Sequence, residues 1–457
     1  MNDVIAAIAT AMTASGIGII RLSGDQAREV VSKVYRSKNG KKDIRKVPSH
    51  TIHYGFICDQ EEIIDEVLVM VMDGPHSYTG ENTIEIDCHG GVLAMKKVLE
   101  TVIKYGARPA EPGEFSKRAF LNGRMDLSQA EAVIDIINAK SDYALKSSIS
   151  QLKGSVMEAV KEIRSDIIYH IAFIESALDD PEHVSIDGYA AELEKSIYIQ
   201  KKRIKKFLDS AEEGKIIKEG IKTVIVGKPN AGKSSLLNLL VGEDRAIVTD
   251  IAGTTRDILE ETITLHGISL HIIDTAGIRN THDIVEQIGV GKAKEYAKDA
   301  DLILYVVDSS VPLDENDKEI IPLLQEKQAI VLLNKTDLES VVTADMLEKK
   351  LNKPILSISA KEETGMDQLE DSIKEMFFAG EVAFNDEVYI TNIRHKTALK
   401  EAYDSLCQVE ESIAMNMPED FFSIDLMSAY ESLGSIIGES VGEDLVNEIF
   451  SKFCTGK

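Results

Sequence analysis

The sequence lacks the features of a membrane protein or of a disulfide-stabilised secreted protein. It has four cysteines in 457 residues, and their spacing matches neither a disulfide framework nor a metal site. No apolar run approaches the ~18 residues that a membrane-spanning helix needs. The N-terminus is apolar for a few residues but has no basic lead, so a secretory signal is not expected. We therefore expect a cytoplasmic protein that keeps its cysteines as free thiols. These are Cys58, Cys88, Cys407 and Cys454.

Positive charge is also scarce. The chain has 51 basic and 77 acidic residues, for a net charge of −26. That balance argues against broad, nonspecific adhesion to nucleic acid, although it does not exclude a local basic patch. The densest basic runs are 41–46 and 201–206, and each such pattern is more often a solvated helix face or loop than a binding site. The length predicts about three domains, and the hydrophobic content of 44% is enough to bury their cores.

The most informative motif is a phosphate-binding loop. Residues 227–234 read Gly-Lys-Pro-Asn-Ala-Gly-Lys-Ser, between a β-branched apolar run at 223–226 and a helix-like segment at 235–240. In that context the backbone wraps the phosphates, and the amides of the helix N-terminus face the anion. Lys233 is expected to reach the terminal phosphates and Ser234 to ligate Mg²⁺. The other loop residues expected to contact the nucleotide are Asn230, Ala231, Gly232 and Ser235.

Two later motifs identify the base. Residues 334–337 read Asn-Lys-Thr-Asp after the apolar run 329–333. The Asp337 carboxylate can accept two N–H donors of guanine that adenine lacks, while Asn334 and Lys335 would hold neighbouring loops and the base face. A second loop follows the strand-like run 355–358 and would give a backbone amide to the guanine carbonyl. It consists of Ser359, Ala360 and Lys361. The predicted nucleotide is GTP.

The segment around residue 274 carries the hydrolysis chemistry. Asp274-Thr275-Ala276-Gly277 ends the strand-like run 270–273, with Asp274 placed for the Mg²⁺ shell and the Gly277 amide for the terminal phosphate. Ile278 follows, where signalling GTPases carry a glutamine that orients water. Either hydrolysis is slow or another residue orients the water, and acidic candidates lie within 283–286. A threonine of the segment 253–257, Thr255, can close the Mg²⁺ shell.

The chain divides into four predicted segments. Residues 1–119 read as an α+β domain, 120–215 as the first part of a helical domain, 216–379 as an inserted doubly wound P-loop GTPase domain, and 380–457 as the second helical part. The multidomain fold class is thus α/β and α+β. Residues 128–180 contain no proline and a single glycine, so we expect one long helix there, with helix again over 189–212.

Together these motifs resemble the MnmE (TrmE) type family of tRNA-modification GTPases over essentially the full length. The resemblance is carried by residues 18–24, 78–91, 112–124, 227–234, 249–257 and the Cys-Thr-Gly-Lys end of the chain. It implies addition of an aminomethyl or carboxymethylaminomethyl group at carbon 5 of the wobble uridine of certain tRNAs. It also implies a homodimer formed through the N-terminal domain, and a heterotetramer with an FAD-binding MnmG (GidA) type partner.

The resemblance further implies a reduced folate, 5,10-methylenetetrahydrofolate or 5-formyltetrahydrofolate, as the one-carbon donor. By family match, the N-terminal folate-binding domain would line its site with Arg21, Glu85, Arg124 and Lys457. Arginines suit the glutamate carboxylates of folate, and Glu85 suits the donor-rich pterin. Cys454 lies in the family tail, where a role in the modification chemistry and an idle thiol both stay open. The chain departs from the family at 11–16, where many members are richer in Gly and Pro.

The resemblance also implies that potassium takes the place of an arginine finger. The matching positions are Asn230, Thr249, Ile251 and Thr254, with Ile251 using its main-chain oxygen. Glu286 matches the residue that positions the attacking water through a bridging water. Two alternatives are a ribosome-assembly GTPase that binds RNA and a GTP-driven scaffold switch. The sequence has no G-x-x-G clamp or strongly basic domain to favour the first, and the second predicts no folate binding.

Overall fold

The computed structural model describes residues 3–180, 182–183, 188–242, 261–265, 267–273, 296–378, 389–439, 441–454 and 456. It consists of two compact units. The first comprises Met1–Ile134, Gln151–Leu193 and Asp404–Lys457, and the second comprises Asp135–Ser150 and Glu194–Tyr403. The chain passes between the units more than once, so segments distant in sequence share one unit.

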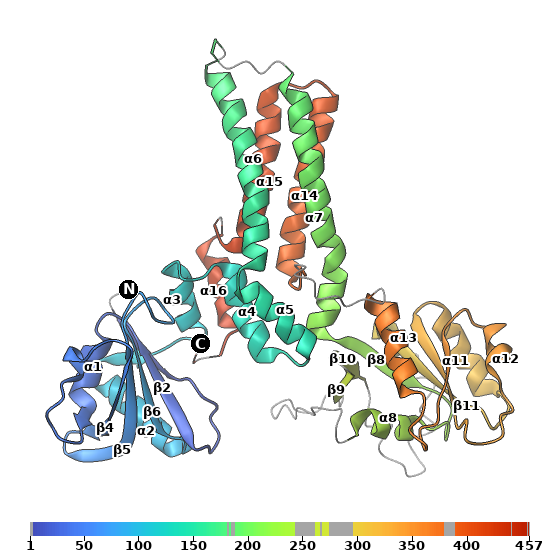
Figure 1. The fold of residues 1–457 in the computed structure, drawn as a ribbon, viewed down its shortest axis with the longest axis horizontal. Coiled ribbons are helices and arrows are strands. Elements are labelled where there is room, and N and C mark those ends of the chain that lie inside the picture. The colour runs from blue at the N-terminus through green and yellow to red at the C-terminus, as the bar shows by residue number, and fades with distance from the viewer. Residues whose placement is uncertain are drawn as a thin grey trace. The chain divides into compact units, whose positions relative to one another are not determined.

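The first unit contains a seven-stranded sheet in the order β3-β4-β5-β6-β2-β1-β7, antiparallel except for the pair β1 and β7. Figure 1 shows this sheet with α1 and α2. The α+β fold expected for the N-terminal domain is confirmed. The elements are β1 (Val4–Ile8), β2 (Ile17–Ser23), α1 (Ala27–Val34), β3 (Tyr35–Ser37), the 3₁₀ turn η1 (Ile44–Lys46), β4 (Thr51–Asp59), β5 (Glu62–Met72), β6 (Thr83–His89), α2 (Val92–Lys104) and β7 (Ala107–Pro109).

Strand alternation gives this sheet two different faces. Along β5, Val67, Val69 and Val71 are buried with apolar residues of α1 and α2, so the helices cover that face. The intervening Leu68 points the other way and is exposed, as are Ile52 and Tyr54 on the same face of β4. The face turned away from α1 and α2 therefore combines exposed apolar residues with the strand positions that carry Arg21 and Glu85.

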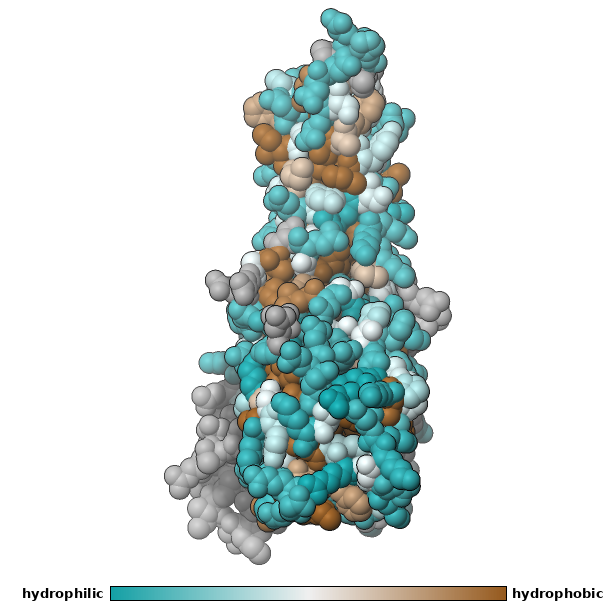
Figure 2. All heavy atoms as spheres, turned by 90° about the vertical axis from the view of Figure 1, so that its left-hand side faces the viewer, coloured by the Kyte–Doolittle hydropathy of each residue, from teal (hydrophilic) through white to brown (hydrophobic). Residues whose placement is uncertain are grey.

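Helices follow the sheet domain. They are α3 (Glu114–Leu121), α4 (Leu127–Asn138), α5 (Asp142–Leu152), α6 (Ser155–Asp179), α7 (Tyr189–Glu219), α14 (Ile393–Ala414), α15 (Glu419–Ile437) and α16 (Glu443–Ser451). Within the first unit, α6 and α15 lie side by side (Figure 1), and Arg164 donates to the Tyr430 carbonyl at 3.2 Å and pairs with Glu439. Brown apolar areas interrupt the polar surface of the long helices in Figure 2, and α6 exposes Ile168 and Leu178.

The single helix expected over 128–180 is wrong. The segment forms α4, α5 and α6, because local capping interrupts a periodicity that continues through it. The Ser141 hydroxyl accepts from the Ala144 amide at 3.1 Å at the start of α5, and Gly154, with φ of +99°, precedes α6. Helix α7, in contrast, runs seven residues beyond the predicted 212. No helix in the described ranges is both long and apolar enough to span a bilayer.

The second unit contains a six-stranded sheet in the order β13-β12-β11-β8-β10-β9, parallel except for β9. In β11, Leu302, Leu304 and Val306 enter one core with residues of α8 and α13, while Ile303, Tyr305 and Val307 enter another with residues of α11 and α12. Helices therefore cover both faces, which confirms the doubly wound GTPase fold. Its elements are β8 (Ile221–Val226), α8 (Lys233–Val241), β9 (Glu261–Leu265), β10 (Ile268–Ile272), β11 (Leu302–Asp308), α11 (Glu315–Gln325), β12 (Gln328–Asn334), α12 (Ala344–Glu348), β13 (Ile355–Ser357) and α13 (Met366–Phe378).

Candidate functional site

The phosphate loop joins the carboxyl end of β8 to the start of α8. Gly227 and Gly232 adopt φ values of +156° and +99°, and Asn230 adopts +61°. A Cβ at Gly227 would lie 2.4 Å from the Val306 carbonyl oxygen, and one at Gly232 would lie 2.1 Å from the Asn334 Nδ2. These two glycines are therefore required for the loop to pass the neighbouring strands. Ala231 is buried, and Ser234 and Ser235 lie in the first turn of α8.

Lys233 closes this loop on itself. Its Nζ donates to the carbonyl oxygens of Gly227 at 2.9 Å and Lys228 at 2.8 Å. The ammonium group thus lies across the loop, and the first amides of α8 follow it without a side-chain cap. The amides of a helix N-terminus together with a lysine suit an anion, as the sequence predicted for the phosphates.

Asn334 links the phosphate loop to the base-recognition loops. It is buried, its Nδ2 donates to the Ala231 carbonyl at 2.9 Å, and its Oδ1 accepts from the Ala360 amide at 3.0 Å. The Ser359 hydroxyl donates to Asp337 Oδ1 at 2.8 Å, which orients that exposed carboxylate. The structure therefore brings the candidate residues of loops 230–235, 334–337 and 359–361 together at one edge of the sheet.

Lys335 has a partner that the sequence did not reveal. It adopts a φ of +65°, and its Nζ forms a 2.6 Å ion pair with Asp308 at the end of β11. Burial alone would raise the pKa of Asp308, but hydrogen bonds from Lys335 and Ser310 outweigh it and lower that pKa. The ion pair fixes the lysine stem beside the position expected for the base. Asp308 is the last residue of β11, after six apolar or aromatic residues. An acidic residue at the end of such a strand was the signal in the sequence that could have identified it as the partner of Lys335.

Lys228 is a second residue that sequence reasoning missed. It is buried inside the phosphate loop, and its Nζ lies 3.0 Å from the Pro312 carbonyl and 3.3 Å from Asp317 Oδ2. Asp317 also accepts from the Tyr305 hydroxyl at 2.7 Å, and burial followed by that hydrogen bond raises the pKa of Tyr305. This buried network anchors the outer side of the loop. No pattern in the sequence marks it.

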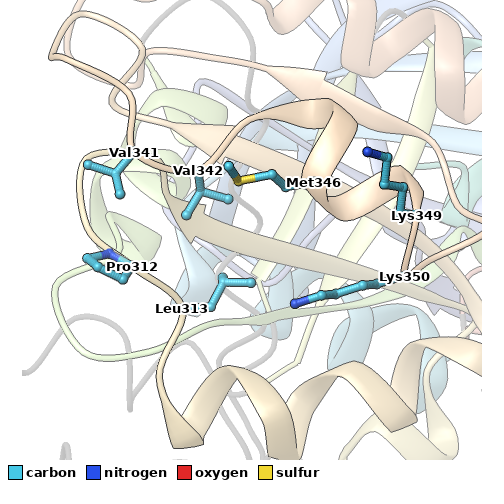
Figure 3. Close-up of a pocket in the computed structure, with 7 residues that line it drawn as sticks. All are labelled: Pro312, Leu313, Val341, Val342, Met346, Lys349 and Lys350. Atoms are coloured by element: carbon cyan, nitrogen blue, oxygen red, sulfur yellow. The ribbon is translucent and has the colours of Figure 1, made fainter.

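A cavity of about 380 Å³ opens nearby in the same unit (Figure 3). Its walls are formed by Pro312, Leu313, Val341, Val342, Met346, Lys349 and Lys350. It contains no carboxylate or amide side chain that could accept the N–H donors of guanine, so it is not the base site. The nucleotide edge of the sheet is defined by the loops instead.

Several predicted residues lie outside the described part of the chain. They are Thr249, Ile251, Thr254, Thr255, Asp274, Thr275, Ala276, Gly277, Glu286 and Lys457. Their assignments stay predictions. Within the described ranges no group of three or more His, Cys, Asp or Glu side chains could hold a metal ion.

Three of the four residues expected to bind folate, Arg21, Glu85 and Arg124, gather in the first unit. Arg21 on β2 lies opposite Glu85 on β6 in the strand register, and its Nε forms a 2.7 Å ion pair with that carboxylate. The Arg21 guanidinium lies 5.3 Å from the centre of the Tyr78 ring, and that of Arg124 lies 4.9 Å from the same centre. Tyr78 therefore joins two guanidinium groups that are far apart in sequence.

The C-terminal tail reaches this group. Arg21 Nη1 donates to the Gly456 carbonyl at 3.2 Å, and the Gly113 amide donates to the Cys454 carbonyl at 3.3 Å. A Cβ on Gly456 would lie 2.6 Å from the Ile8 carbonyl oxygen, so only glycine fits there. The Cys454 side chain is exposed. The site thus combines arginines, a carboxylate and an aromatic ring with the main chain of Cys454 and Gly456.

Two aromatic residues of this site had no role assigned from sequence. Tyr78 donates to or accepts from the Ser116 hydroxyl at 2.7 Å, and Phe115 lies 5.7 Å below the Arg21 guanidinium. Both stand inside the motifs at 78–91 and 112–124, so the signal was present. Flat rings beside paired arginines suit a ligand that has both a ring system and carboxylates, which is the chemistry of a folate.

The comparisons with known proteins agree with this arrangement. The family description "GTP-binding protein TrmE N-terminus" matches residues 4–124, and "MnmE helical domain" matches residues 127–454. The tRNA modification GTPase MnmE of Lachnoclostridium phytofermentans is 59% identical over 456 residues, covering 100% of each chain. The protein of the same name from Clostridioides difficile is 50% identical over 459 residues, again covering 100% of each. The chain belongs to the MnmE family of tRNA modification GTPases.

Proposed function

We propose that this GTPase modifies the wobble uridine of certain tRNAs at carbon 5, with a reduced folate as one-carbon donor. An FAD-binding MnmG type protein would be its partner in a heterotetramer. The observation that carries the proposal is the group formed by Arg21, Glu85, Tyr78 and Arg124 with the C-terminal tail. Tetrahydrofolates offer glutamate carboxylates to the guanidinium groups, ring N–H donors to Glu85 and a flat ring to Tyr78. Such a reaction belongs to the cytoplasm, where tRNA is found.

Titration calorimetry with 5-formyltetrahydrofolate tests the folate assignment. Arg124→Ala should weaken binding by about tenfold or more, because one charged hydrogen-bonding group and its stacking on Tyr78 are lost. Tyr78→Phe should bind nearly as the parent does, because the ring remains. Arg36→Ala, a change at an exposed arginine of the same sheet, is the matched control. If the parental chain gives no heat with any reduced folate, the folate-dependent function is refuted. A scaffold switch or a ribosome-assembly role would then be the remaining alternatives.

Homodimerisation through the N-terminal sheet is part of the proposal. Ile52, Tyr54 and Leu68 are exposed on neighbouring strands, and Tyr54 and Leu68 are direct cross-strand partners. An apolar group of this kind on a sheet face suits a second copy of the chain. Leu68→Glu should convert a dimer to a monomer in light scattering, whereas Leu93→Glu, at an exposed position of α2, should not. A parental chain that is monomeric at high concentration would remove this element.

Potassium-dependent hydrolysis is the third element. Asn230 stands exposed in the phosphate loop, and Ile278 stands where a glutamine would orient water. A cation held by Asn230 with oxygens of Thr249, Ile251 and Thr254 would neutralise charge in the transition state, as an arginine finger does. Mg²⁺ would be held by Ser234 and Thr255. Turnover should be faster in potassium than in sodium at matched ionic strength, and equal turnover would refute the cation role.

A further inference from the structure

Helix α7 carries a concentration of positive charge that the functions above do not use. From Lys195 to Leu208 it has six basic residues and no acidic residue, in a chain where acids outnumber bases 77 to 51. Solvated helix faces usually alternate the sign of their charges, because pairs at i and i+4 stabilise the helix. A one-sign run suits an anionic partner if its side chains share one exposed surface.

Burial identifies which of these residues share a surface. Ile197, Gln200 and Ile204 are buried and mark the inner face of α7. The side chains on the opposite side are exposed, and we call them the α7 basic face. Its members are Lys195, Tyr198, Ile199, Lys202, Lys205 and Lys206. They recur at spacings of three and four residues and extend about 16 Å along the helix, given a rise of about 1.5 Å per residue.

The α7 basic face also exposes an aromatic ring among its lysines. Tyr198 is 66% exposed and the adjacent Ile199 is 51% exposed. A face that only kept the helix in water would gain nothing from two large apolar side chains at its centre. Rings flanked by cations are the arrangement that binds nucleic-acid strands, because rings stack on bases while cations neutralise phosphates.

Three lysines of this face, Lys195, Lys202 and Lys205, are available for a stronger partner. Within the described ranges Lys195 and Lys202 form no ion pair, and Lys205 pairs with Asp209 at 3.0 Å in a solvent-exposed i, i+4 contact. Exposed pairs of that kind are weak, so a phosphate can displace the carboxylate. Positive charge continues onto α14, because Lys201 of α7 and Lys400 of α14 lie 5.2 Å and 5.5 Å from the centre of the ring of Tyr403 on α14.

We propose that the α7 basic face binds the phosphate backbone of tRNA and that Tyr198 stacks on one of its bases. This inference rests on the proposed function for the identity of the RNA. The charge supplies affinity, and the local patch compensates for the repulsion that a net charge of −26 exerts on a polyanion. The face would hold the tRNA body during turnover.

The test measures binding of a fluorescein-labelled, unmodified tRNA transcript to the full chain by anisotropy, between about 50 and 200 mM salt. The triple variant Lys195→Ala, Lys202→Ala, Lys205→Ala should bind at least about tenfold more weakly. Its slope of log affinity against log salt should fall by roughly 2 to 3, because each lost phosphate contact removes about 0.7 to 0.9. Lys349→Ala with Lys350→Ala, at two exposed lysines of the same unit, should match the parent. Parental affinity and slope in the triple variant would overturn the proposal.

The ring is tested separately. Tyr198→Ala should weaken binding about fivefold or more with an unchanged salt slope, and Tyr198→Phe should bind as the parent does, because stacking needs the ring alone. Parental binding by Tyr198→Ala would refute the stacking role. Poly-glutamate serves as a second probe: if the triple variant loses poly-glutamate and keeps tRNA, the face binds an acidic protein and the RNA proposal falls.

Failure of the proposed function is distinguishable from failure of this inference. None of the substituted residues belongs to the nucleotide or folate candidate sites, so GTP hydrolysis and folate titration should equal the parental values in every α7 variant. A parent that binds no folate but shows the lysine-dependent salt slope would remove the folate proposal and support the α7 assignment.

Discussion

Arg118 offers the sharpest test of how the N-terminal domain holds its candidate site. It is 1% exposed and contacts three carboxylates, Asp3 at 2.9 Å, Glu81 at 3.0 Å and Glu114 at 3.1 Å. These residues connect the chain start, the loop that carries Tyr78 and the first turn of α3. Replacing Arg118 by methionine keeps an unbranched apolar stem and removes the charged guanidinium group.

The loss of folding stability expected for Arg118→Met depends on which ion pairs remain in the variant. Breaking a buried ion pair on one side typically costs about 3–5 kcal/mol, because the partner charge stays buried. Arg108 still pairs with Glu114 and Asp3, and Asp3 is partly exposed, so the lower end of that range, about 3 kcal/mol, is expected. Adding Glu81→Gln to the variant should recover part of the loss, since Glu81 pairs with Arg118 and, unlike Glu114, has no ion pair with Arg108 among the described residues.

The pH dependence of this stability loss tests whether the ion pairs cause it. Burial would raise the pKa values of Asp3 and Glu114, but hydrogen bonds from Arg108 and Arg118 outweigh it and lower both. Carboxylates with lowered folded-state pKa values stabilise the fold above their unfolded-state values, and that stabilisation is lost as pH falls through the folded-state values. The deficit of Arg118→Met should therefore be largest near neutral pH and shrink below about pH 4.

Hydrogen exchange of the full chain measures this locally, because β1 and α3 report the opening of this region without requiring two-state unfolding. Arg45→Met is the matched control, since its ion pair with Asp43 is exposed and its loss should leave protection unchanged. Equal protection of β1 and α3 in parent and Arg118→Met at pH 7, or a deficit that is independent of pH, would refute the reasoning.

Three further predictions concern the nucleotide. Asp337→Asn should lower GTP affinity by about 10²-fold or more with a nearly parental kcat at saturation, because charged hydrogen bonds to guanine are lost; a parental Kd by fluorescent-nucleotide titration would contradict the base assignment. Glu286→Ala should keep the GTP affinity and lower kcat by ~10²-fold or more in a phosphate-release assay, and a parental rate would make Asp283 the next candidate. Gly232→Ala should reduce GTP binding by about tenfold or more, because its Cβ would displace Asn334, whereas Gly442→Ala, with open space around its Cβ, should behave as the parent does.

Sequence reasoning succeeds where one local rule determines position. A glycine-rich loop between a buried strand and a helix can adopt few backbone conformations. The loops that follow parallel strands meet at one edge of the sheet. The predicted strands at 223–226 and 329–333 therefore appear within β8 and β12, with Asn334 between the phosphate and base loops. The same local rules fail at residues 139–141 and 153–154, where breaks of three and two residues divide a segment whose apolar period is unbroken.

The folate candidate site had to be taken from resemblance, because its geometry depends on long-range pairing. Arg21 meets Glu85 only through the register of β2 with β6, and it meets Gly456 across almost the whole chain. No periodicity in either segment specifies that register. The motifs around Tyr78 and Phe115 marked the region, but the rings could be assigned a role only once both guanidinium groups were found beside them.

The basic run of α7 shows how burial changes the meaning of a sequence pattern. Six cations without an acid are compatible with a solvated helix and with a binding surface, and composition favours the solvated helix. The decisive fact is the direction of Tyr198: a tyrosine on the inner face would have belonged to the core and left only lysines outside. Because Ile197, Gln200 and Ile204 occupy the inner face, the ring is forced into solvent among the charges. An acidic chain that exposes a tyrosine and an isoleucine within its densest run of lysines has a surface suited to RNA. The salt dependence of tRNA binding by the lysine variant will show whether RNA binds there.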